Sequence, residues 1–434
     1  MKTITGRVMT KTLITFFEHE KKTFKDLEKD GLSKNEIKKL IKLNDKLKIF
    51  NIGYNSIKAK QYVGVIKIKN MSIQILPKIY KNEDNEDIKQ KEALTNLLYI
   101  LSYTNNLKIK ENIANLAKNN DLFEIYTYLF AKNLLGEIER GIYRDYNKRE
   151  ENLSYLKGKL NINKQIKHNL IKKHKLYCTH NEFSENNSIN QILKYTVELL
   201  KNITKNPKNK KLLNDLSFIF EDVEYKIIIQ KDFERITFNR MNERFKPYIK
   251  MAELFIKNSS INLTTKDLET FSLIFNMEIL FEKFIGNILR KYKDEIFGKT
   301  SLNVYLQYKG CYLMKDDNGN EIFALKPDVV IKENDKTVLI IDTKYKKLIN
   351  NRSRNYNISQ PDIYQMFAYL KKYNCKNGIL LYPKYEEEIN KRFKFDNENL
   401  YIKQINLKHN SKSKFEYINL IKDDLKSIIN NLER

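Results

Sequence analysis

Two aspartates and a lysine stand at the ends of two short apolar runs separated by a polar turn. Asp328 precedes the first run, Asp342 and Lys344 end the second, and residues 333–336 form the turn, a pattern that predicts a β-hairpin. Residues 338–341 are apolar at consecutive positions, which indicates a strand covered on both faces in the middle of a sheet. The hairpin therefore places charged side chains at the end of a buried strand.

The chemistry of this set follows from its geometry. Asp328 is expected opposite Asp342, with side-chain roots about 5 Å apart, and a divalent cation between the two carboxylates removes their repulsion. Lys344 points to the same face as Asp342, because side chains alternate along a strand. Two acids and a lysine suit Mg²⁺ with a bound water, the set needed for metal-assisted hydrolysis of a phosphodiester. The alternative is a surface hairpin with ordinary solvated charges.

The order Pro327-Asp328, then Asp342-Thr343-Lys344, resembles the PD-(D/E)xK motif of the restriction-endonuclease-like nuclease superfamily. In that superfamily, a helix ahead of the hairpin can contribute an acid to the metal site. We predict a helix over residues 267–292, and the resemblance assigns Glu282 to that acid.

Two features after the hairpin also favour a nuclease. Gln365 and Tyr369 are four residues apart and share one helix face. The pair resembles the QxxxY element of the RecB-like branch, which borders the active site and contacts DNA. Residues 378–383 then form a short apolar strand of the same α/β core.

Composition narrows the class of partner and site. The chain has 434 residues, a formal net charge of +26 and a pI near 9.5, which favours nucleic acid as partner, although abundant Lys, Asn and Ile also indicate a coding bias. Cys178, Cys311 and Cys375 lie far apart, which argues against a disulfide scaffold, a zinc site or an iron–sulfur cluster. Without a secretory or membrane-spanning segment, we expect a cytoplasmic protein.

The predicted fold class is multidomain α+β. Residues 1–90 read as a small β-rich interaction domain, with strands over 3–17 and within 47–79, a hairpin turn at 69–71, and a helical stretch 22–43 in which Ser33 is an N-cap. Residues 91–255 are predicted to be mainly helical, with helices over 93–101 and 121–146, and residues 256–434 to form an α/β restriction-endonuclease-like domain.

Basic and aromatic residues recur in the middle region, at residues 140–144 and 238–248. They can grip phosphates and stack on bases, or form hydrogen bonds and packing between helices. Gly298-Lys299-Thr300 resembles the end of a phosphate-binding loop, but Lys293 stands where the loop needs glycine. We therefore expect no nucleotide triphosphatase in this chain.

The order of motifs along the chain resembles the McrC family, the endonuclease subunits of McrBC systems that cut modified DNA. The similarity runs from about Gly53 to Pro383. It is carried by residues 62–66, 75–79, 141–144, 156–159, 183–194 and 239–244 together with the hairpin.

The resemblance implies a McrB-like AAA+ GTPase ring as partner, which recognises double-stranded DNA with modified cytosine, and no membrane. It implies that the N-terminal region docks into the ring and stimulates GTP hydrolysis. It also implies that Asp328, Asp342 and Glu282 bind Mg²⁺ and that Lys344 assists the water. Two alternatives stay open: a stand-alone RecB-like repair or recombination nuclease, and a non-catalytic DNA-binding assembly protein.

Overall fold

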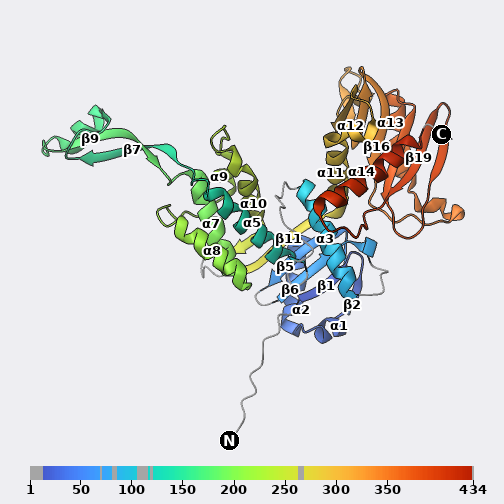
Figure 1. Ribbon diagram of the computed structural model, residues 1–434, viewed down its shortest axis with the longest axis horizontal. Coiled ribbons are helices and arrows are strands. Elements are labelled where there is room, and N and C mark those ends of the chain that lie inside the picture. Colours follow the sequence, from blue (N-terminus) through green and yellow to red (C-terminus); the bar gives the residue numbers. More distant parts are fainter. Residues whose placement is uncertain are drawn as a thin grey trace, which may run out of the picture. The chain divides into compact units, whose positions relative to one another are not determined.

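The computed structural model describes residues 13–68, 71–80, 86–104, 116–117, 121–261 and 268–432 (Figure 1). These residues fall into two compact units: one combines the chain up to Leu122 with the chain from Thr270 onward, and the other is the chain between them. Both contain helices and sheets, so the chain is a mixed α/β protein of more than one unit. The boundaries predicted near residues 90 and 255 stay predictions.

A sheet in the first unit joins distant parts of the chain. Strand β6 lies between β1, with which it runs parallel, and β5, with which it forms an antiparallel hairpin, and β11 pairs with the other edge of β5. A smaller sheet has β4 between β2 and β3. The bounds are β1 (Leu13–Phe17), β2 (Lys21–Thr23), β3 (Phe50–Gly53), β4 (Ser56–Ala59), β5 (Tyr62–Ile68), β6 (Met71–Leu76) and β11 (Leu268–Asn276). The strands predicted within 47–79 are confirmed; positions 3–12, 69 and 70 lie outside the described residues.

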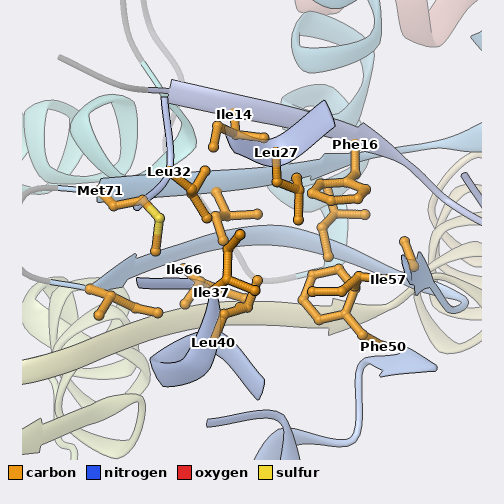
Figure 2. Packing of buried hydrophobic residues seen from close by; sticks show 14 of the residues in the cluster. Ile14, Phe16, Leu27, Leu32, Ile37, Leu40, Phe50, Ile57, Ile66 and Met71 are labelled. Atoms are coloured by element: carbon orange, nitrogen blue, oxygen red, sulfur yellow. The ribbon is translucent and has the colours of Figure 1, made fainter. Parts of the chain in front are cut away.

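Two helices, α1 (Phe24–Lys29) and α2 (Lys34–Leu47), pack with strands of both sheets in one hydrophobic core. Ser33 is the N-cap of α2, as predicted: its hydroxyl accepts from the Glu36 backbone N–H at 3.3 Å, and the Glu36 carboxylate accepts from the Ser33 N–H at 2.9 Å. Figure 2 shows apolar side chains of the strands and of α1 and α2 pointing toward one another. They include Ile14, Phe16, Leu27, Leu32, Ile37, Leu40, Phe50, Ile57, Ile66 and Met71.

Gly64 in β5 marks a close approach to β11. Its φ is 141°, and a Cβ there would lie 1.9 Å from the Leu273 carbonyl oxygen, a backbone atom of the paired strand. We expect Gly64→Ala to lower the free energy of unfolding by on the order of 3–5 kcal/mol, measured by chemical denaturation. Gly136→Ala is the matched control, because a Cβ at Gly136 meets nothing within 4 Å. Equal stability of the two variants would contradict the close approach.

The prediction of one helix over residues 267–292 is wrong for residues 268–276, which form a strand. The chain forms β11 up to Asn276 and only then α11 (Met277–Lys291), with the Asn276 side chain accepting from the Glu278 N–H at 2.8 Å as N-cap; Asp267 lies outside the described residues. The apolar spacing near Phe271 fits either a strand or a helix. The segment forms a strand because it pairs with β5, where Phe271 lies opposite Lys67.

A second sheet of the first unit has the strand order β12-β15-β16-β17-β19-β18. Strand β16 runs antiparallel to β15 and parallel to β17, so it lies in the middle of the sheet, as its apolar run predicted. Strands β13 and β14 form a separate hairpin. The bounds are β12 (Leu302–Leu306), β13 (Cys311–Lys315), β14 (Glu321–Leu325), β15 (Val329–Glu333), β16 (Lys336–Thr343), β17 (Asn377–Pro383), β18 (Lys391–Phe395) and β19 (Glu398–Ile405).

Helices of the first unit flank this second sheet. Helix α11 packs against α3, β12 and β16, while α13 packs against β16 and β17. The helix predicted over 93–101 is confirmed inside α3, and the strand predicted over 378–383 inside β17. The bounds are α3 (Glu86–Thr104), α12 (Lys293–Phe297), α13 (Gln360–Lys372) and α14 (Lys414–Asn430), with 3₁₀ turns η1 (Lys78–Tyr80) and η3 (Arg352–Asn357).

The second unit joins a helical body to a β-rich arm, which we define as residues 145–184. Figure 1 shows β7 and β9 of the arm as a long ribbon extending away from the helices of this unit. The helices are α5 (Leu122–Ile138), α7 (Ser188–Ile203), α8 (Pro207–Ile219), α9 (Gln230–Glu234), η2 (Glu243–Phe245) and α10 (Lys246–Lys257), followed by strand β10 (Ser259–Ile261); the arm contains β7 (Asp145–Leu153), β8 (Lys159–Leu160), α6 (Ile162–Asn169) and β9 (Leu176–Ser184).

The arm corrects two predictions for the middle region. The helix predicted over 121–146 ends at Ile138, and residues 145–184 are not mainly helical. Strand β7 has no buried position, so its sequence lacks the alternation of apolar and polar residues by which a half-buried strand is predicted.

Candidate active site

The β15–β16 hairpin has the predicted form. Its two-residue loop, Asn334 and Asp335, has φ of 45° and 67°, the left-handed pair of a type I′ turn. Val329 pairs with Ile341, so the next position in the same register places Asp328 opposite Asp342.

The Asp328 carboxylate accepts hydrogen bonds from Thr343 at the end of β16 and from Gln307, which follows β12. Its Oδ2 accepts from the Thr343 backbone N–H at 2.8 Å and from the Thr343 hydroxyl at 2.7 Å. Its Oδ1 lies 3.3 Å from Nε2 of Gln307, which also donates to the Glu282 carboxylate. Gln307 thus joins Asp328 of the hairpin to Glu282 of α11, and Glu282 lies beside the hairpin, where the superfamily resemblance placed it.

Asp342 and Lys344 form an ion pair at the end of β16, with Lys344 Nζ 2.6 Å from Asp342 Oδ2. Asp342 is buried, at 3% exposure. The same ammonium donates to Gln365 Oε1 at 2.8 Å and lies 3.8 Å from an oxygen of Asp362. Lys344 is therefore fixed from three sides by acceptors.

The three acids perturb one another. Burial raises the pKa of Asp328 to about 6, with a further contribution from the Glu282 charge, and burial together with the Asp328 charge raises the pKa of Asp342 to about 6. Burial likewise raises the pKa of Glu282. Burial of Lys344 lowers its pKa, but the carboxylates of Asp342, Asp362 and Asp328 outweigh burial and raise it. The site therefore combines repelling acids with one ammonium that stays charged.

Gln365 and Tyr369 lie on α13 as predicted, but in different surroundings. Gln365 is exposed and bonded to Lys344. Tyr369 is buried, and its hydroxyl donates to the Lys326 carbonyl oxygen at 3.2 Å, two residues before Asp328. Tyr369 thus holds the segment that carries Asp328, and the DNA contacts implied for the pair remain predictions.

Three residues of the site were not among the predicted ones. Thr343 lies inside the motif itself, and Asp362 is an acid three residues before Gln365 in the first turn of α13, so both had a local signal. Gln307 had none, because it follows β12 and meets Asp328 only through the pairing of β12 with β15.

The donor set fits a hard cation. Glu282, Asp328 and Asp342 supply carboxylate oxygens, the ligands Mg²⁺ prefers, and each acid raises the pKa of another through a repulsion that a cation relieves. No three His, Cys, Asp or Glu side chains among the described residues stand as a ready-made metal cluster. Lys344 contacts Asp342, and Gln307 contacts Glu282 and Asp328.

The basic and aromatic residues of the middle region form internal contacts at the base of the arm. Arg244 donates to the Gly141 carbonyl oxygen at 2.5 Å, and Asn190 donates to the Tyr143 carbonyl oxygen at 2.8 Å. Asn242 reaches the Tyr143 hydroxyl at 3.4 Å. These contacts support packing over phosphate binding for these side chains.

None of the helices in the described part of the chain combines the length and apolar composition that crossing a membrane requires.

The known proteins that this chain resembles come from McrBC systems. The chain is 22% identical over 326 residues to the type IV methyl-directed restriction enzyme EcoKMcrBC of Escherichia coli (strain K12), covering 72% of this chain and 92% of that protein. It shares its fold with a chain in the refined half-complex from the tetradecameric assembly of Thermococcus gammatolerans McrB AAA+ hexamers with bound McrC, with a TM-score of 0.72, 24% identity and coverage of 96% and 100%. A chain in the cryo-EM structure of the Thermococcus gammatolerans McrBC complex gives a TM-score of 0.53 at 29% identity, with coverage of 64% and 87%.

A family model described as the McrBC 5-methylcytosine restriction system component matches residues 57–383. That match spans well over half of the chain and includes strands β5 and β6 and the hairpin with Asp328, Asp342 and Lys344. The chain therefore belongs to the McrC family of McrBC restriction system components.

Proposed function

We propose that this protein is the Mg²⁺-dependent endonuclease subunit of a cytoplasmic McrBC-like restriction complex, with a PD-(D/E)xK nuclease site. The observation that carries the proposal is the convergence of Glu282, Asp328, Asp342 and Lys344 at the end of β16. Phosphodiester hydrolysis needs oxygen ligands for a metal and a nearby cation, and this set supplies both.

Glu282, Asp328 and Asp342 are the residues that would hold Mg²⁺. When bound, the ion supplies Lewis-acid polarisation of a phosphate oxygen and a bound water of lowered pKa. Lys344 keeps its charge and lies beside the acids, so it orients the attacking water and offsets the negative charge that develops at the phosphate. Gln365 holds the Lys344 ammonium, and Thr343 orients the Asp328 carboxylate.

We propose that the substrate is double-stranded DNA with modified cytosine and that the partner is a McrB-like AAA+ GTPase ring. The family description supports the modified base, and the solved complexes of similar chains support the ring. The net charge of +26 suits a polyanion.

The surface that contacts the ring has two candidates. The resemblance to the McrC family implies docking through the N-terminal region, residues 1–90. The arm presents a larger set of exposed apolar side chains, a feature of interaction surfaces. These side chains are Tyr146, Tyr155, Leu156, Ile162, Ile166, Leu170, Ile171 and Phe183. Ile52 and Tyr54 are the exposed apolar side chains of the β3–β4 hairpin in the first unit.

The experiment that tests the proposed function is plasmid cleavage in Mg²⁺ with methylated and unmethylated DNA, each with and without GTP and a McrB-like partner. We expect cleavage only when methylation, GTP, partner and Mg²⁺ are present together. Cleavage by the protein alone would favour the stand-alone repair nuclease. DNA binding without cleavage under every condition would favour the assembly protein.

A further inference from the structure

A buried glutamate, Glu18, and a half-buried lysine, Lys78, lie in the first unit outside the nuclease site. Glu18 directly follows β1, is fully buried, and its N–H donates to the Leu76 carbonyl oxygen at 2.9 Å. Its Oε2 accepts from the Lys78 backbone N–H at 3.0 Å, while its Oε1 is buried with no hydrogen-bond partner among the described residues. Burial raises the pKa of Glu18 to about 7 and lowers the pKa of Lys78. Burying a carboxylate oxygen without a hydrogen bond costs stability relative to apolar packing.

Both charged side chains converge on Tyr345. The Tyr345 hydroxyl donates to Glu18 Oε2 at 3.0 Å. The Lys78 ammonium donates to the Tyr345 carbonyl oxygen at 3.2 Å and lies 4.7 Å from the centroid of its ring. Tyr345 is therefore held at its backbone, its ring and its hydroxyl by two residues from the β1–β6 end of the N-terminal sheet.

Tyr345 adjoins the nuclease site through two neighbours. It directly follows Lys344, and its ring lies 5.8 Å from the ring of Phe281, the residue before Glu282. Strand β16 ends at Thr343, and beyond it the Lys344 N–H still donates to the Leu381 carbonyl oxygen at 2.9 Å. The next anchor along the chain is the contact of Tyr345 with Glu18 and Lys78.

We propose that Glu18 and Lys78 are positioning residues of the nuclease site: by fixing Tyr345 they set the backbone that carries Lys344 and the packing of the helix turn that carries Glu282. The proposal rests on the proposed nuclease function. It makes the geometry of the cleavage site depend on the N-terminal sheet.

The test uses the full-length protein with its McrB-like partner, GTP and methylated plasmid. Tyr345→Phe removes only the hydroxyl and keeps the ring against Phe281, and Glu18→Ala removes the acceptor. We expect kcat for cleavage to fall about tenfold in both, with KM for DNA and stimulation of the partner GTPase unchanged. Glu18→Gln keeps an oxygen that can accept both hydrogen bonds, so it is expected to restore most of kcat.

Asp121→Asn is the control for losing a buried ion pair. Asp121 Oδ2 lies 3.6 Å from Lys67 Nζ in the same unit. Thermal unfolding of all variants separates positioning from instability. If Tyr345→Phe and Glu18→Ala cleave like the wild type, or if their losses match that of Asp121→Asn at equal stability, the positioning role is wrong. If the wild type itself does not cleave, the proposed function fails, and this inference fails with it.

Discussion

Asp342→Asn is expected to reduce DNA cleavage by at least about 10³-fold, because the substitution removes the buried carboxylate that faces Asp328 and binds Lys344. Asparagine has the same shape, and it removes a carboxyl group whose pKa is raised by burial and by the Asp328 charge. Thermal stability is therefore expected to stay equal to that of the wild type or to rise. The measurement is plasmid cleavage with partner, GTP and Mg²⁺, alongside partner binding and GTP hydrolysis, which are expected to be unchanged.

Asp335→Asn gives a matched control in the same hairpin. Asp335 is exposed in the turn with φ of 67°, a conformation that asparagine adopts readily, so this variant is expected to cleave like the wild type. If Asp342→Asn loses cleavage, partner binding and GTPase stimulation together, the hairpin acids are structural and the proposed chemistry is wrong.

Shortening the arm is expected to separate the protein from its ring partner. Lys148 pairs with Asn181 across β7 and β9, so an Asn-Gly turn can replace residues 149–180 and close a two-residue hairpin at a paired position. The shortened chain keeps the base of the arm but loses most of its exposed apolar side chains. We expect stimulation of the partner GTPase and co-elution with the ring to fall at least about tenfold.

The comparison for this prediction is a surface variant of the N-terminal sheets. Deleting residues 1–90 would remove β1, β5 and β6, and thus the strand that pairs with β11, so its outcome would report unfolding. Ile52→Ser with Tyr54→Ser changes exposed side chains only, at 39% and 96% exposure. If this double variant loses binding to the ring and the shortened arm does not, docking occurs through residues 1–90, as the family resemblance implies.

The local features of the hairpin were determined by the sequence alone. The apolar run of β16, the polar turn and the positions of Asp328, Asp342 and Lys344 fixed its register, because one shifted residue would turn every side chain to the opposite face. The sequence also predicted that Ser33 is the N-cap of α2 and that Gln365 and Tyr369 share one face of a helix, since capping and helical spacing depend on near neighbours.

Features that depend on contacts between residues far apart in the sequence were determined only by the tertiary structure. Residues 268–276 form a strand only because β5 pairs with them, and Gln307 joins Glu282 to Asp328 only because β12 pairs with β15. The arm escaped prediction because β7 buries no face and therefore carries no alternation. The contact of Glu18 with Tyr345 joins residues 327 positions apart in the sequence. It could not be predicted, because the periodicity of a sequence indicates which face of a helix or strand is buried but not which distant residue packs against that face.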